Sequence, residues 1–246
     1  MPGAGAETPG MSHRAEVFVW LVLPYVSVTI FLVGHWWRYR RDQFGWTSRS
    51  TQILESRLLA WGSPLFHLGA LAAIGGHVLG ILVPASVTAK VGISESAYHH
   101  LAGIVGGIAG LVCLAGLGIL TFRRSANARV RITTTVMDVV VFVLLGVLIV
   151  LGEALTLGYT LFGTAYDYRE TVGPWFRSLW YDPQPSLMAD APVGYQIHAA
   201  LPWLLYAVWP FSRLVHVWSI PLQYIGRPYI LYRSRYRARR RTDVAV

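Results

Sequence analysis

The sequence predicts an all-α membrane protein with five transmembrane helices, and three observations support this fold class. First, 54% of the 246 residues are hydrophobic and only 13% are charged, which is too apolar for an ordinary soluble domain. Second, the apolar residues form five long continuous runs, which favours helices over the alternating pattern of a β-barrel. Third, the arginines cluster at the ends of these runs, so the net charge of +9 reflects membrane topology. We therefore expect no nucleic-acid partner.

Each run is long enough to cross about 30 Å of hydrocarbon, which takes roughly 20 helical residues. The five helices are expected at residues 17–37, 58–83, 98–122, 133–157 and 193–219. The third run is rich in glycine, and small residues allow close helix approach in lipid. Residues 1–16 lack the basic region and cleavage site of a secretory signal and are interpreted as a flexible tail. Residues 17–222 then form the transmembrane domain, and residues 223–246 form a basic tail.

Arginine placement predicts the orientation of the helices, because cytoplasmic connections carry the excess of positive charge. Arginine is abundant after the first and third runs and in the C-terminal tail, and sparse in the other connections. The N-terminus is therefore expected outside and the C-terminus in the cytoplasm, as an odd number of spans requires. The outer connections are then residues 84–97 and 158–192, and the second of them is expected to be partly ordered at the interface.

Four histidines lie inside two of the apolar runs. His67 and His77 are in the second run, and His198 and His216 are in the fifth. An imidazole in hydrocarbon is costly without a partner, so such residues are functional candidates. Iron ligated axially by two imidazoles supplies that partner, and two facing helices with two histidines each can hold two haems. The sequence contains no Cys-x-x-Cys-His motif for covalent haem attachment, and its single cysteine excludes an iron–sulfur cluster held by this chain.

The predicted orientation pairs these histidines by depth. His67 and His216 lie nearer the cytoplasm, and His77 and His198 nearer the outside. The spacing is imperfect, because ten residues of helix span about 15 Å and eighteen span about 27 Å. Helix tilt, the Gly75–Gly76 step, and kinks at Pro202 and Pro210 are expected to absorb the difference. The remaining histidines are interpreted as solvated or interfacial: His13, His35, His99 and His100.

Two alternatives of other classes remain open at this point. A metal-ion transporter would use the histidines as ligands, but its ligands should converge near one depth. A haem-free membrane anchor for a cytoplasmic complex would leave each histidine hydrogen-bonded to a neighbouring helix.

Four stretches carry a more specific pattern. They are GHWWRYRRDQFGWTSRSTQILE at 34–55, LFHLGALAAIGGHVLGILVP at 65–84, RVRITTT at 129–135 and PFSRLVHVWSIPLQY at 210–224. These stretches resemble the gamma subunit of the membrane-bound respiratory nitrate reductase, the dihaem cytochrome b that anchors that complex. Related haem-b subunits of sulfur-metabolising and heterodisulfide reductase-type complexes share the histidine pattern and remain an alternative.

The resemblance implies a dihaem helical bundle over residues 17–222, with the inner haem b held by His67/His216 and the outer one by His77/His198. It implies quinol oxidation near the outer haem, with menaquinol or ubiquinol as donor. Electrons would pass inward to an iron–sulfur beta subunit and on to a molybdenum-cofactor alpha subunit, which reduces nitrate. The expected location is the plasma membrane of a prokaryote, with several crossings.

The resemblance also suggests residues around the haems. The expected quinol pocket comprises Gly76, His77, Lys90 and Tyr98, where Lys90 and Tyr98 are equally good candidates for the polar partner. Glu153 departs from the family pattern and is interpreted as a proton carrier or an interfacial acid.

On the inner side, Arg38, Arg131 and Arg213 are candidates to pair haem propionates, against the simpler interpretation of positive-inside charge. The C-terminal tail is expected to dock the soluble subunits or to bind anionic lipid.

Overall fold

The computed structural model describes residues 11–161, 163 and 166–218. Within these residues all regular structure is helical, as predicted, and no strand occurs. The α-helices are α1 His13–Val17, α2 Leu23–Arg41, α3 Arg57–His77, α4 Ala85–Lys90, α5 Glu95–Ala126, α6 Ala128–Arg131, α7 Val136–Leu155, α8 Val172–Ser178 and α9 Val193–Val208. The π-helical segments are η1 Phe18–Val22, η2 Val78–Leu82 and η3 Thr156–Leu161. The 3₁₀ segments are η4 Pro185–Met188, η5 Trp209–Phe211 and η6 Arg213–Trp218.

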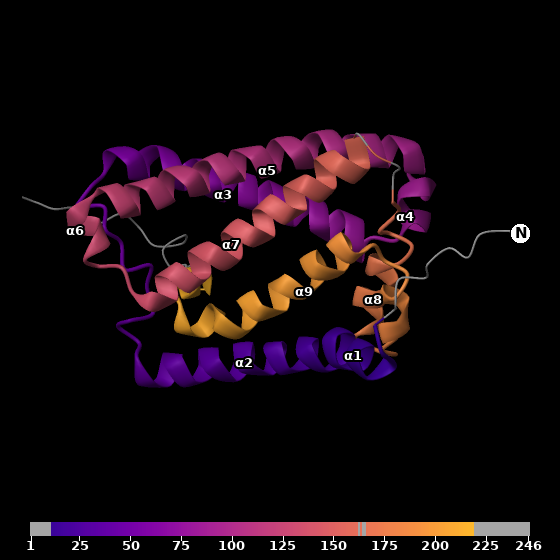
Figure 1. The fold of residues 1–246 in the computed structure, drawn as a ribbon, viewed down its shortest axis with the longest axis horizontal. Coiled ribbons are helices and arrows are strands. Elements are labelled where there is room, and N and C mark those ends of the chain that lie inside the picture. Colours follow the sequence, from indigo (N-terminus) through magenta and orange to yellow (C-terminus); the bar gives the residue numbers. More distant parts are fainter. Residues whose placement is uncertain (1–10, 162, 164–165, 219–246) are drawn as a thin grey trace, which may run out of the picture.

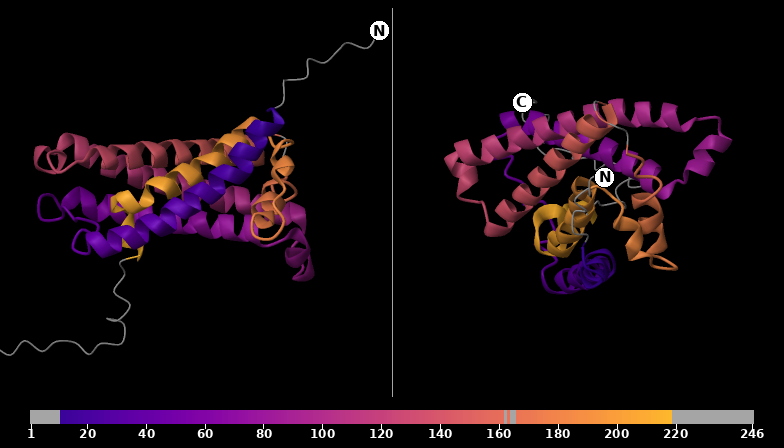
Figure 2. Two further views of the ribbon diagram at one scale, coloured as in Figure 1. Left: turned by 90° about the horizontal axis from the view of Figure 1, so that it is seen from below. Right: turned by 45° about the vertical axis from the view of Figure 1, so that its right-hand side comes forward.

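Five long helices, α2, α3, α5, α7 and α9, run between the two ends of the molecule (Figure 1). α3 packs mainly against α5, whereas α9 packs against α2 and α7. Figure 2 shows α3, α5 and α7 in one group and α2 with α9 in a second group beside it. The end with α6 and the last turns of α2 and α5 is called the arginine end, and the end with α4 and α8 is called the α8 end.

Four helical stretches are long and apolar enough to cross a membrane. They are His13–Arg41, Arg57–Leu82, Glu95–Ala126 and Val136–Gly158. Each coincides with one of the first four predicted runs. The first begins at His13, four residues before the predicted start, so helix extends into the segment interpreted as a tail. The basic tail at 223–246 lies outside the described residues.

The fifth predicted run is not one continuous helix. α9 ends at Val208, and the chain continues as two short 3₁₀ segments separated by Ser212 in extended conformation, with φ −108° and ψ −177°. Pro210 explains the interruption, because proline has no N–H to donate and its ring clashes with the preceding turn. Pro202, in contrast, lies inside α9 without ending it. The fifth membrane crossing therefore remains a prediction, and so does the orientation of the bundle.

Arg38 holds the interrupted segment in place. Its side chain is buried, and its guanidinium donates to the carbonyls of Pro210 and Ser212 at 2.6 and 2.7 Å and to that of Gly45 at 2.9 Å. Carbonyls freed by a helix break need such donors in an apolar setting. The guanidinium of Arg38 thus supplies donors for carbonyls that have lost their helical N–H partners near Pro210.

An aromatic core closes the α8 end. Trp20 and Trp175 are each 1% exposed, and their rings meet edge to face with centroids 5.4 Å apart. The indole N–H of Trp175 donates to the carbonyl of Trp20 at 3.0 Å. Met188 and Trp203 belong to the same cluster, so the long connection before α9 is partly ordered, as expected, and packs across the end of the bundle.

Two glycines bring α3 and α5 together. A Cβ on Gly69 would overlap the backbone of Cys113, and a Cβ on Gly116 would overlap the backbone of Phe66. The glycine-rich third run therefore serves close helix packing, as the sequence predicts.

We expect Gly116→Val to destabilise the protein by about 1–3 kcal/mol, because the added methyl groups cannot fit against the Phe66 backbone. The matched control is Gly118→Val on the same helix, where a Cβ meets nothing within 4 Å. Thermal unfolding of the two variants in the same detergent measures the difference. Equal midpoints for both variants would contradict the packing argument.

Candidate functional site

The four histidines of the second and fifth apolar runs come together in two pairs. The rings of His67 on α3 and His216 on η6 have centroids 5.9 Å apart, with an interplanar angle of 72°. The rings of His77 on α3 and His198 on α9 have centroids 6.0 Å apart, with an angle of 33°. These are the pairs expected from depth. The break at Pro210, together with the helix arrangement, accommodates the unequal spacings of ten and eighteen residues.

The ring separations fit a metal ion between the rings. Two imidazoles that ligate one ion from opposite sides, with bonds of about 2.0 Å, have ring centres roughly 6 Å apart. The Nδ1–H groups of His67, His77 and His216 donate to the carbonyls of Ser63, Ala73 and Arg213, at 2.8, 2.7 and 2.7 Å. A carbonyl only accepts, so these contacts fix the tautomer with the lone pair on Nε2. Ligating histidines are commonly held in this way.

The surroundings also leave space for a flat macrocycle. His67 and His77 lie on an exposed face of α3, while the helix packs through another face against α5. Gly76, the quinol-pocket candidate beside His77, is also open, since a Cβ there would meet no atom within 4 Å. On α7, a Cβ on Gly152 would lie 2.8 Å from the Cε1 atom of His198, so this glycine makes room for the imidazole. The residues of both pairs therefore fit haem, although ligation stays a prediction.

Of the expected quinol-pocket residues, Tyr98 lies in a buried polar contact at the α8 end. Its hydroxyl is 3.1 Å from the hydroxyl of Tyr168, and both would contact a Cβ on Gly80, three residues beyond His77. The guanidinium of Arg169 lies 4.0 Å from the Tyr98 ring centre. Burial raises the pKa of Tyr168 far above its ordinary value, with a further contribution from Tyr98, so its hydroxyl stays protonated.

Lys90 is exposed at the end of α4. Of these two candidates, Tyr98 is the one whose hydroxyl lies against Gly80, in the segment that continues from His77.

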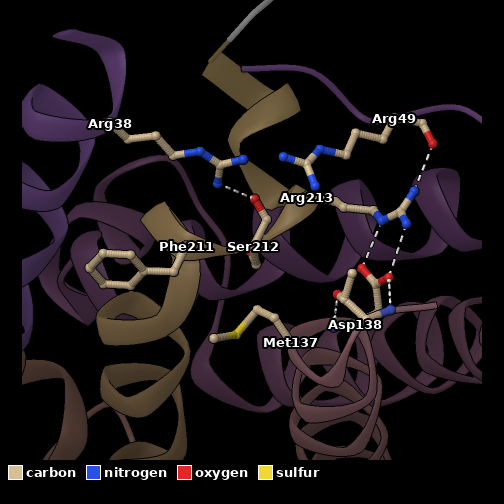
Figure 3. A pocket seen from close by; sticks show the side chains of 8 residues that line it. Arg38, Arg49, Met137, Asp138, Phe211, Ser212 and Arg213 are labelled. Atoms are coloured by element: carbon tan, nitrogen blue, oxygen red, sulfur yellow. Dashed lines mark hydrogen bonds and ion pairs between the residues drawn. The ribbon is translucent and has the colours of Figure 1, made fainter. Parts of the chain in front are cut away.

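Two of the three predicted propionate arginines line one small cavity of about 50 Å³ at the arginine end (Figure 3). Both arginines already form hydrogen bonds with other groups of this chain. Arg38 bonds the carbonyls of the interrupted fifth segment, and Arg213 donates to both oxygens of Asp138 at 2.7 and 3.0 Å. Arg131 is exposed and donates to the carbonyl of Ser125 at 3.3 Å. The propionate role of all three remains a prediction.

Asp138 is a residue that the sequence analysis missed. It is 5% exposed, caps the start of α7 through Thr135, and pairs with Arg213 and, at 3.5 Å, with Arg124. The spacing Thr-x-x-Asp at the start of an apolar run is a helix-capping signal that could have identified it. Asp138 links α5, α7 and the segment that carries His216.

Glu153 is buried on α7, and its carboxyl group contacts Gly110 of α5. Its Oε1 atom has no hydrogen-bond partner among the described residues. The interpretation of Glu153 as an acid facing water does not agree with this burial, and its role in proton transfer stays a hypothesis.

An apolar helical bundle with two facing histidine pairs defines a class, the membrane proteins equipped to hold haem. The comparisons with known proteins place the chain within this class. The family described as nitrate reductase gamma subunit matches residues 16–235. The chain belongs to this family.

Three relatives illustrate its range. The chain is 44% identical to the nitrate reductase gamma chain of Bacillus subtilis over 218 residues, covering 88% of this chain and 97% of the relative. It is 32% identical over 227 residues to the respiratory nitrate reductase 2 gamma chain of Escherichia coli, covering 92% and 100%. It is also 52% identical over 222 residues to the nitrate reductase-like protein NarX of Mycobacterium tuberculosis, covering 89% of this chain but only 34% of that protein. The chain therefore spans about a third of the length of NarX.

Proposed function

We propose that this chain is the membrane subunit that passes electrons from quinol to a respiratory nitrate reductase. It binds two b haems, the inner one through His67 and His216 and the outer one through His77 and His198. The observation that carries the proposal is the pairing of the four rings at 5.9 and 6.0 Å. Membership of the nitrate reductase gamma subunit family supports haem as the cofactor and the other subunits of that complex as partners.

The orientation of the bundle follows from the charge distribution, and the direction of electron flow follows from the soluble partner subunits expected for this family. The arginine end is the cytoplasmic side, since this end gathers the basic residues of α2, α5 and α6. Quinol is oxidised near the outer pair, and its two protons leave at the α8 end. Its two electrons move inward to an iron–sulfur subunit and a molybdenum-containing subunit. The reaction thereby separates charge across the plasma membrane without a proton channel.

Haem supplies one-electron transfer when it is bound. The chain holds its two sites ten residues apart on α3, about 15 Å along the helix axis, which divides the bilayer into two electron-transfer steps. Tyr98 and the space beside Gly76 lie close to the outer pair and form the polar and apolar sides of the quinol pocket.

The test is a haem and redox measurement on the complex isolated from membranes. A pyridine haemochrome assay should give two b haems per chain, and quinol should reduce them in the absence of nitrate. Added nitrate should reoxidise them. A well-folded chain without haem would support a haem-free anchor instead. Haems that quinol reduces but nitrate leaves reduced would point to another terminal acceptor, as the alternative of a sulfur-metabolising or heterodisulfide reductase-type complex requires.

A further inference from the structure

Three potential metal-ligand atoms converge at the α8 end, outside both histidine pairs. Glu95 and His99 lie one helical turn apart on the same face of α5, and Asp167 lies in the segment before α8. The Nε2 atom of His99 is 3.6 Å from Glu95 Oε1 and 3.7 Å from Asp167 Oδ2. All three atoms lie within 4.8 Å of one another. Neither the proposed electron transfer nor the family assignment uses this cluster.

We propose that Glu95, His99 and Asp167 form a binding site for a divalent metal ion of the zinc class. Two ligands of a tetrahedral zinc ion with bonds of about 2.0–2.1 Å lie roughly 3.4 Å apart. The two distances from His99 exceed this value by only a few tenths of an ångström, and the Glu95 and Asp167 oxygens lie within 4.8 Å of each other, so rotation of the side chains brings all three ligands to one ion. One imidazole and two carboxylates suit zinc or another borderline divalent ion, whereas soft ions prefer sulfur ligands.

Arg169 holds the two carboxylates in position by hydrogen bonds. Its guanidinium donates to both oxygens of Glu95 at 3.0 and 3.1 Å, and its backbone N–H donates to Asp167 Oδ1 at 2.8 Å. Arg169 is itself 4% exposed and is fixed by bonds to the carbonyl of Val83 and the hydroxyl of Thr88. Hydrogen bonds of this kind orient ligating carboxylates, and each carboxylate oxygen keeps a second lone pair that can face an ion.

The charge and access of the site also suit a cation. The cluster contains two carboxylates, of which only Glu95 pairs with the guanidinium of Arg169, so one carboxylate charge is left for a cation. The side chains of Glu95, Asp167 and His99 are 37%, 26% and 17% exposed, which gives an ion a route from solvent and leaves a coordination position for water. The bound ion would link α5 to the segment that carries Tyr168. The site therefore acts as a clamp on the connection before α8, beside Tyr98 and Tyr168.

The experiment measures zinc directly on the complex, purified with a tag that contains no histidine and stripped with a chelator. Equilibrium dialysis against zinc, followed by elemental analysis, should show one bound zinc ion per chain. His99→Ala should weaken this binding at least about 100-fold, and Asp167→Asn at least about tenfold. The matched control is His100→Ala, the neighbouring and exposed histidine of α5, which should bind zinc as the wild type does.

A second measurement separates metal binding from simple misfolding. Zinc should raise the thermal midpoint of the wild type and of the His100→Ala variant but not of the other two. The haem spectrum of each variant reports its fold, since none of these residues belongs to a histidine pair. No zinc bound to the wild type, or equal binding by His99→Ala and wild type, would overturn the proposal. Either result would mean that His99 serves only an ion-pair network with the two carboxylates.

Discussion

Replacing His67 with alanine is expected to remove one of the two haems and to leave the other. The same haem should be lost from His216→Ala, because the two rings face each other at 5.9 Å and a haem cannot keep bis-histidine ligation without both. His77→Ala and His198→Ala should remove the second haem, through the pair at 6.0 Å. Haem content per chain should fall from two to about one in each variant.

Haemochrome assays and low-temperature spectra of the four variants identify which haem is missing. His100→Ala serves as the control, since it changes an exposed histidine outside both pairs and should keep both haems. Loss of the same haem from His67→Ala and His198→Ala would refute the pairing and, with it, the assignment of an inner and an outer site.

Replacing Gly76 with tryptophan is expected to lower quinol-dependent nitrate reduction by at least about tenfold while both haems remain bound. The reason is that a side chain at this position meets no protein atom within 4 Å, so the indole would fill space beside His77 rather than disturb the helix packing. Activity with a reduced dye that donates directly to the soluble subunits should stay unchanged.

Gly118→Trp is the matched control, because Gly118 is equally open but lies on α5. Normal quinol oxidation by the Gly76→Trp variant would show that the pocket lies elsewhere. Loss of the outer haem from this variant would show that the open space belongs to the macrocycle, and it would also remove Gly76 from the quinol site.

The elements of the fold that the bilayer dictates were predictable from sequence. The thickness of the hydrocarbon sets the length of an apolar run, and the four runs that became long helices were located to within a few residues. The fifth run shows where this reasoning fails. Both Pro202 and Pro210 permit a break, but at Pro210 the guanidinium of Arg38 donates to the freed carbonyls, and the carbonyl of Gly45 accepts from the same guanidinium. Those contacts depend on tertiary structure and leave no local signal.

The same distinction applies to the site. Depth along two helices was enough to predict which histidines meet, since depth follows from residue count and orientation. Arginine roles were not predictable in this way. Positive charge indicates the side of the membrane, but the groups that bind Arg213 are a buried carboxylate, Asp138, and carbonyls of distant loops. His99 was interpreted as interfacial because it lies at the outer start of the third run, and sequence spacing alone could not show that Asp167, on another segment, lies beside it.

The interrupted fifth segment makes the two histidine pairs mechanically unequal. His198 lies within α9, where main-chain hydrogen bonds on both sides stiffen its position. His216 lies on a short 3₁₀ segment. Arg38 donates to the carbonyls of Ser212 and Gly45, and Arg213 donates to the carbonyl of Arg49, so these two side chains tie the segment to the connection after α2. Displacement of the connection that carries Gly45 and Arg49 would therefore move His216 through two arginine side chains, whereas the main-chain hydrogen bonds that hold His198 lie within α9.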